Sequence, residues 1–263
     1  MGLFRFLKEK IRPEKHVITE SVTGVEPRFE YIHVQDLKPK DDPIGRDVRY
    51  YNNGIHDKDD NMNCSLYQGR AKFAETNRFR KVELYIFPDE TVEQALEENG
   101  YLPEGAEVEK VSFPRPTDAQ IAAMKSHGNL IPDNVSRMDI SAIMDRIINN
   151  DTETAPKYLF DFAEQHRIVA SRFTGLRYMH LTIWDNLNER ESLGFFLLCV
   201  RKYKYDCWNP EKFEEYCGMY ESLMSDSSFS NSFKKFVQNG FYGFDSNTGI
   251  RSNAYNIAKD RIS

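Results

Sequence analysis

The sequence changes character at one short segment, Pro114-Arg115-Pro116. Proline fixes its own φ angle and disfavours helix in the residue before it, so this segment separates elements of different kinds. Before it, short runs of β-branched and aromatic residues dominate, and after it apolar residues recur at helical spacing. We therefore predict an α+β protein, with a small mixed α/β domain at residues 1–114 and an all-α helical domain at residues 117–263.

The first part of the chain contains several strand patterns and one clear helix start. Thr91 with Gln94 three residues later forms a capping box, which predicts a short helix that ends near Gly100. Asn53-Gly54 is a hairpin signal within a polar loop at residues 38–63. We expect strands at residues 16–22, 29–34, 81–87 and 108–113, with Val82, Leu84 and Ile86 on one face.

The first residues form a further pattern. Over residues 3–12, apolar residues recur at helical spacing with basic residues between them, which predicts a short amphipathic helix that ends before Pro13. Such a helix either packs on its own domain or lies on a membrane surface, and we favour packing. The stretch lacks the apolar core and the cleavage site of a signal peptide.

The second part of the chain reads as about six to eight helices. Thr117 with Gln120 and Ser136 with Asp139 mark two helix starts. The segment 195–200 is apolar nearly all round, which predicts a helix at the centre of a bundle. We expect further helices at residues 154–165, 172–184, 187–205, 229–237 and 253–262, and one that begins at Asn209-Pro210.

Charge and cysteine content limit the function classes. The formal net charge is −6, which argues against capture of nucleic acid or acidic lipid by the whole surface. The mean hydropathy is −0.63, and no apolar run approaches the roughly 20 residues of a membrane-spanning helix. The four cysteines form no C-x-x-C pair, so we expect reduced thiols and a cytoplasmic location.

Motifs for catalysis, cofactors or metals do not emerge. Asp57, Asp59 and Asn61 resemble the start of a calcium loop, but Met62 stands at the glycine position and Gln68 at the bidentate glutamate position. No nucleophile elbow, H-E-x-x-H pair or glycine-rich phosphate loop is present in the sequence. We predict no catalytic residues, no metal site and no cofactor, and an enzyme would need a pocket built from both halves of the chain.

Cations next to aromatic residues are the one pattern with a chemical meaning. Arg and Lys bind phosphates, and Tyr or Phe stack on bases, so the combination is typical of nucleic-acid contact. The alternative is that these cations cap helix ends or pair with neighbouring acids. A basic run in the first part comprises Arg70, Lys72, Arg78, Arg80 and Lys81. The candidate nucleic-acid-binding residues that we select lie in the helical part: Arg172, Arg177, Arg201, Lys202, Tyr203, Lys204 and Tyr205.

Several segments after the boundary resemble a helical region of uncharacterised bacterial and phage proteins. The resemblance lies in residues 116–121, 131–144, 164–168 and 171–175. In some of those proteins the region accompanies domains linked to DNA processing, including the HIRAN type. The resemblance covers about half of the chain and implies an association with DNA, and it implies no catalytic residue.

Two function classes follow from these observations. The first is a non-catalytic interaction protein of bacterial or phage origin, which binds a protein partner through its α+β domain or a helical groove. The second is an accessory protein that binds nucleic acid through the basic and aromatic residues of the helical domain. The two differ in whether these cations meet on one face beside exposed Tyr203 or Tyr205, or pair with Asp and Glu.

Overall fold

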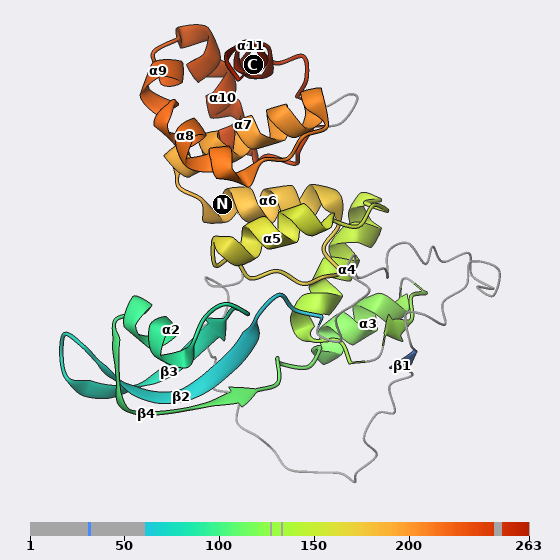
Figure 1. Cartoon of the computed structure of the whole chain (residues 1–263). Coiled ribbons are helices and arrows are strands. Elements are labelled where there is room, and N and C mark those ends of the chain that lie inside the picture. The colour runs from blue at the N-terminus through green and yellow to red at the C-terminus, as the bar shows by residue number, and fades with distance from the viewer. Residues whose placement is uncertain (1–30, 33–60, 127, 133, 245–248, 263) are drawn as a thin grey trace. The chain divides into compact units, whose positions relative to one another are not determined.

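The computed structural model describes residues 31–32, 61–126, 128–132, 134–244 and 249–262 (Figure 1). The chain divides into two compact units, Tyr31–Met179 and a second unit that contains His180–Ser263. These compact units meet between Met179 and His180, and the predicted domain division at residues 114–117 stays a prediction. The two units are described in turn.

A three-stranded antiparallel sheet dominates the start of the first unit. Its strands are β2 (Ser65–Phe73), β3 (Arg78–Ile86) and β4 (Tyr101–Val111), in the order β3-β2-β4. Helix α2 (Val92–Glu98) begins with the predicted capping box of Thr91 and Gln94, and it covers one face of the sheet (Figure 1). The predicted face of β3 is confirmed: Val82, Leu84 and Ile86 are buried in one cluster with Ala71, Ala95 and Leu96.

Helices follow the Pro114–Pro116 segment, as predicted. The first unit contains α3 (Asp118–Ser126), α4 (Arg137–Asn149), α5 (Lys157–Gln165) and the start of α6 (Leu176–Asn186). A short strand interrupts them, because β5 (Ile131–Pro132) pairs in parallel with β1 (Tyr31–Ile32). With a small sheet followed by a helical region, the protein is α+β, and this prediction is confirmed.

Buried polar groups hold the helices of the first unit to the loop before α6. The Asp139 carboxylate accepts a hydrogen bond from the Ser136 backbone N–H at 2.7 Å and from the Ser171 hydroxyl at 2.6 Å. The guanidinium of buried Arg146 donates to the carbonyl of Phe173 in that loop at 3.4 Å, and to the carbonyls of Asp151 and Thr152, which lie before α5, each at 3.0 Å. Buried polar groups stabilise a fold only when they are paired, so these bonds fix the path of the loop.

Helix α7 (Glu189–Tyr205) is the central helix of the second unit. Its residues 192–200 are all buried, as the apolar run at residues 195–200 predicts. Phe196 lies within 6.4 Å, centroid to centroid, of five other phenylalanine rings, a spacing typical of aromatic clusters. Around α7 the unit contains the 3-10 helix η4 (Pro210–Lys212) and helices α8 (Phe213–Gly218), α9 (Tyr220–Met224), α10 (Ser227–Asn239) and α11 (Asn253–Arg261).

Several boundaries differ from the sequence predictions, and β4, for example, begins at Tyr101 rather than at residue 108. Helix α5 begins at Lys157 rather than at residue 154, with Pro156 as its N-cap. Helix α6 begins at Leu176 rather than at residue 172, because the backbone of residues 174–176 pairs with residues 153–155. The helix predicted after Pro210 is divided into η4, α8 and α9, so the described chain after Pro116 contains nine α-helices, more than the six to eight predicted.

The four cysteines lie in different environments. Cys64, Cys199 and Cys217 are buried, whereas Cys207 is exposed. Burial raises the pKa of Cys64 to about 12 and that of Cys217 to about 11. All four are free thiols, in agreement with the expectation from the sequence.

Some predictions concern parts of the chain outside the described residues. These are the amphipathic helix at residues 3–12, the strand at residues 16–22, the Asn53-Gly54 hairpin and the acidic loop that begins at Asp57. Of the strand predicted at residues 29–34, only β1 is described. Within the described residues, no helix has the length and apolar character needed to cross a bilayer.

Candidate nucleic-acid interface

Strands β2 and β3 form a hairpin whose geometry follows from its turn. The turn at residues 74–77 ends with Asn77 in the left-handed region at φ 51°, and the Asn77 N–H donates to the Phe73 carbonyl at 2.8 Å. Asn tolerates this conformation better than most residues. The register that results places Lys72 opposite Phe79 and Arg70 opposite Lys81.

The sheet has one face that no described helix buries near the turn. Because side chains alternate along a strand, burial of Val82 and Leu84 against α2 places Phe79 and Lys81 on the opposite, open face. Phe79 is 47% exposed. Arg70 and Lys72 lie on the same face, since paired residues of antiparallel strands share a face.

Five cations gather at this end of the hairpin, and we call them, together with Phe79, the basic hairpin. On the open face, the Arg70 guanidinium lies 5.8 Å and the Lys72 ammonium 5.5 Å from the Phe79 ring centroid. On the other face, the Arg80 guanidinium lies 4.4 Å from the ring of Phe73. The five cations are Arg70, Lys72, Arg78, Arg80 and Lys81, all on β2 or β3.

The charges of the basic hairpin are not neutralised by the described part of the chain. None of its five cations forms a hydrogen bond or an ion pair with a described residue. Glu107 lies opposite Arg70 on β4, yet the two form no ion pair, and on β3 Arg70 faces Lys81. Like charges directly opposite each other destabilise a sheet, so this arrangement opposes stability and favours an anion as a ligand.

Charge changes sign along the open face. Next to the basic hairpin, the Glu83 carboxylate accepts a hydrogen bond from the Gln68 amide at 2.8 Å and from the Tyr85 hydroxyl at 3.0 Å. Burial, and then the negative charge of Glu83, raise the pKa of Tyr85 to about 12. Glu109 lies opposite Gln68 on β4. The region attractive to anions is therefore limited to the turn end of the hairpin.

Two of the candidate residues from the sequence lie in the first unit. Arg172 is 1% exposed, and its guanidinium pairs with the Glu164 carboxylate at 3.3 Å and lies 5.8 Å from the Phe160 ring centroid. Arg177 is exposed near the start of α6, where its backbone N–H donates to the Asp151 carboxylate at 3.1 Å. Arg172 is buried and paired with Glu164, which agrees with the alternative prediction that these cations pair with neighbouring acids.

The other five candidates cluster at the C-terminal end of α7. Lys202 pairs with Asp206, and the Lys204 ammonium donates to the Lys259 carbonyl at 2.7 Å, near the C-terminal end of α11. The Arg201 guanidinium donates to the Tyr216 hydroxyl at 3.4 Å. Tyr203 and Tyr205 are 41% and 43% exposed. Cations at helix C-termini are favourable for the helices themselves, so these contacts have a structural explanation.

The structure thus brings the candidates together in part. Arg201, Lys202, Tyr203, Lys204 and Tyr205 lie on one helix, and Arg172 and Arg177 belong to the other compact unit. That any of them binds nucleic acid stays a prediction. The basic hairpin differs from both groups, because its cations form no ion pair with a described residue and lie on strands rather than at helix ends.

Phe79 is the residue of this site that is not among the candidates predicted from the sequence. The basic run around it is visible there, but the predicted strand begins at residue 81, whereas β3 begins at Arg78. The alternation of Val82, Leu84 and Ile86 extends back to Arg80, and it already indicates that Phe79 and Lys81 point away from the core.

Among the described residues, no group of three or more His, Cys, Asp or Glu side chains is arranged to hold a metal ion.

Comparison with known proteins gives no relative to guide the assignment. No family model matches the chain, and neither a curated protein nor a solved structure matches it.

Proposed function

We propose that this protein is a non-catalytic interaction protein that binds single-stranded nucleic acid through the basic hairpin. The observation that carries the proposal is the exposed Phe79 ring beside cations that have no ion-pair partner in the described chain. Bases of a single strand stack on aromatic rings while Arg and Lys bind the phosphates between them. The proposed site is thus a sheet surface, rather than the residues of the helical part that the sequence predicts.

A single strand fits this surface better than a duplex or an anionic membrane. A duplex offers phosphates but hides its bases, so it would leave Phe79 without a partner. A membrane-binding hairpin would present apolar side chains at its tip, whereas the turn here contains Glu75, Thr76 and Asn77. Exposed Phe79 lies beside the cations on the strand face instead.

The test is fluorescence anisotropy with labelled single-stranded and duplex oligonucleotides at low salt. We expect the wild type to bind the single strand with a Kd of about 10⁻⁶ M or below, because sequence-independent binding of about 10⁻⁴–10⁻⁶ M at physiological salt becomes tighter at low salt. A triple variant, Arg70→Ala with Lys72→Ala and Lys81→Ala, should bind at least about tenfold more weakly, because three phosphate contacts are lost. The matched control removes three cations from α7 instead, by Arg201→Ala, Lys202→Ala and Lys204→Ala.

Phe79→Ala separates base stacking from charge. Loss of one base–aromatic stack weakens binding by about 1–3 kcal/mol, so single-strand affinity should fall while duplex affinity stays the same. Phe79 lies outside the buried cluster, so Phe79→Ala should stay folded and lose only strand propensity, about 1 kcal/mol or less by urea unfolding.

Three outcomes would overturn the proposal. One is that the α7 variant loses as much affinity as the hairpin variant, which would return the site to the helical residues. Another is that Phe79→Ala leaves single-strand affinity unchanged. The third is that polyglutamate, a polyanion without bases, competes with the oligonucleotide at equal charge concentration.

A further inference from the structure

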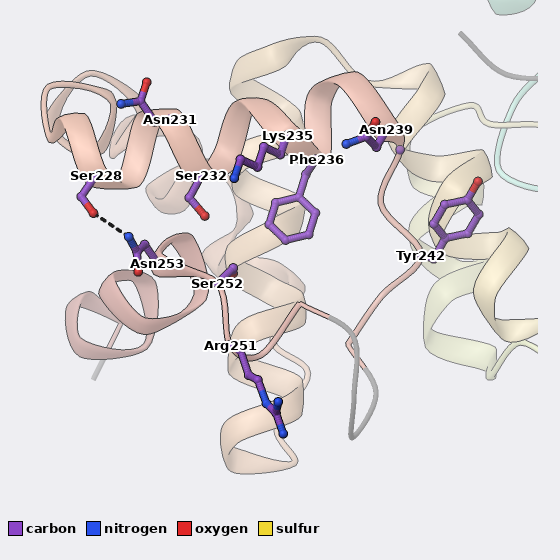
Figure 2. Close-up of a pocket in the computed structure, with 11 residues that line it drawn as sticks. Ser228, Asn231, Ser232, Lys235, Phe236, Asn239, Tyr242, Arg251, Ser252 and Asn253 are labelled. Atoms are coloured by element: carbon purple, nitrogen blue, oxygen red, sulfur yellow. Dashed lines mark hydrogen bonds between the residues drawn. The ribbon is translucent and has the colours of Figure 1, made fainter.

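The second unit contains a cavity that belongs to neither group of cations discussed above. It lies between α10 and the start of α11 and has a volume of about 730 Å³. This volume falls within the range of about 300–1,000 Å³ that is typical of small-molecule sites. Figure 2 shows its lining, which includes Lys235 and Phe236 of α10, Tyr242, and Arg251 just before α11.

The described lining of the cavity is positively charged. Lys235 and Arg251 line it, and its described lining contains no Asp or Glu. Neither cation forms a hydrogen bond or an ion pair with a described residue. Positive charge without a carboxylate among the described lining residues complements an anionic ligand.

Some of the other polar groups of the lining form hydrogen bonds within the protein, and others form none with a described residue. The Ser228 hydroxyl accepts from the Asn253 amide at 2.9 Å, and the Ser232 hydroxyl accepts from the Ala254 N–H at 3.1 Å (Figure 2). The Ser252 hydroxyl caps α11 by accepting from the Tyr255 N–H at 3.1 Å. Two N–H groups of the first turn of α11, those of Ala254 and Tyr255, are therefore already bonded within the protein. The amides of Asn231 and Asn239 make no such bonds to described residues.

Aromatic rings supply the apolar part of the lining. The Phe236 ring points from α10 toward the segment that leads into α11, between the side chains of Lys235 and Arg251 (Figure 2). Tyr242 forms a separate part of the lining. Planar rings of a ligand pack favourably on such side chains.

We propose that this cavity binds a small phosphate monoester that carries a planar ring, the chemistry of a nucleoside monophosphate. The phosphate interacts with Lys235, the Asn231 and Asn239 amides hydrogen-bond to polar atoms of the ligand, and the ring packs on Phe236, with Arg251 as a second positive charge on the other side of that ring. A phosphate monoester carries close to two negative charges at neutral pH, so both cations attract it. The site does not depend on the proposed function of the basic hairpin, because it lies in the other compact unit.

Isothermal titration calorimetry with the full-length protein tests the proposal. The probes are AMP and UMP, with adenosine and uridine as rings without phosphate and inorganic phosphate as the anion without a ring. We expect at least one nucleotide to saturate the protein below about 1 mM and to bind at least about tenfold more tightly than its nucleoside or inorganic phosphate. Lys235→Ala and Arg251→Ala should each weaken nucleotide binding by about tenfold, since each removes a charged contact.

The controls separate this site from the hairpin. Lys234→Ala removes an exposed neighbouring cation of α10 that is outside the lining, and it should leave nucleotide affinity unchanged. The triple variant of the basic hairpin should also bind nucleotide normally. The proposal is overturned if neither nucleotide saturates, if inorganic phosphate binds as tightly as the nucleotides, or if Lys234→Ala weakens binding as much as Lys235→Ala.

Discussion

At the scale of single residues, the pairing of Arg70 with Lys81 is the most informative feature of the sheet. Two cations face each other across the central and edge strands although the chain as a whole is acidic. Nothing in the fold of the hairpin requires a cation at either position, because both side chains are exposed. The Arg70–Lys81 pair lowers stability and contributes no packing. Residues that lower stability in this way are typical of binding sites.

Replacement of Lys81 should therefore separate stability from binding. We expect Lys81→Thr to raise the free energy of unfolding by about 0.2–1 kcal/mol, because the like-charge pair disappears and Thr suits a strand. The same change should weaken binding of the single-stranded oligonucleotide. Urea unfolding and anisotropy measure the two effects.

Lys110→Thr is the matched control for this substitution. Lys110 is exposed on β4 and lies opposite Tyr67 rather than opposite a cation. The control should gain strand propensity alone and leave binding intact. A Lys81→Thr protein that is less stable than the control would contradict the argument from charge repulsion.

At the scale of elements, local signals in the sequence determined most helix starts. Residue spacing predicts the capping boxes at Thr91 and Ser136, and both helices begin directly after these residues. The start of α6 could not be predicted in this way, because the Leu176 N–H donates to the Glu153 carbonyl, 23 residues earlier in the chain, at 2.9 Å. Long-range backbone pairs of this kind leave no pattern in the sequence.

The same distinction applies to the candidate sites. The sequence shows where the basic residues are, but not which of their side chains are buried or paired in the fold. Arg172 is buried because Glu164 and Phe160, on α5, lie next to it. The cations of the basic hairpin stay exposed because strand alternation turns them away from α2. Only the second of these outcomes follows from a local rule.

Helix α4 gives a prediction of its own through Asp145. Burial raises the pKa of this carboxyl from 3.8 to about 6. In that interval the folded protein holds a proton that the unfolded chain has released, so this group lowers the free energy of unfolding as pH rises. We expect Asp145→Asn to gain stability relative to the wild type between about pH 4 and pH 6.

Urea midpoints of both proteins at pH values across this interval measure the effect. Asp260→Asn, which neutralises an exposed carboxyl of α11, is the control for the loss of one charge. An Asp145→Asn difference from the wild type that does not change with pH would show that burial of this carboxyl does not affect folding.

At the scale of the whole molecule, a net charge of −6 surrounds a small basic region. Most of the surface should repel a polyanion, so affinity must come from a limited number of contacts. Each phosphate bound on a single strand contributes about 0.7 to the slope of log K against log salt concentration. Five cations therefore limit the slope to a magnitude of about 3.5.

Anisotropy titrations at several salt concentrations measure this slope. The triple hairpin variant, with two cations left, should show a slope of about 1.4 in magnitude. A slope well above 3.5 for the wild type, or an unchanged slope for the variant, would mean that cations outside the hairpin carry the binding.

The buried cysteines have a consequence for following how the molecule opens. Cys64 lies in the unit Tyr31–Met179, and Cys199 and Cys217 lie in the unit that contains His180–Ser263. A thiol must ionise and meet solvent before it reacts with an alkylating reagent, so these three become reactive only when their surroundings open. Pulsed alkylation followed by peptide mass spectrometry would thus time the opening of each unit separately, with exposed Cys207 as the internal standard for complete reaction.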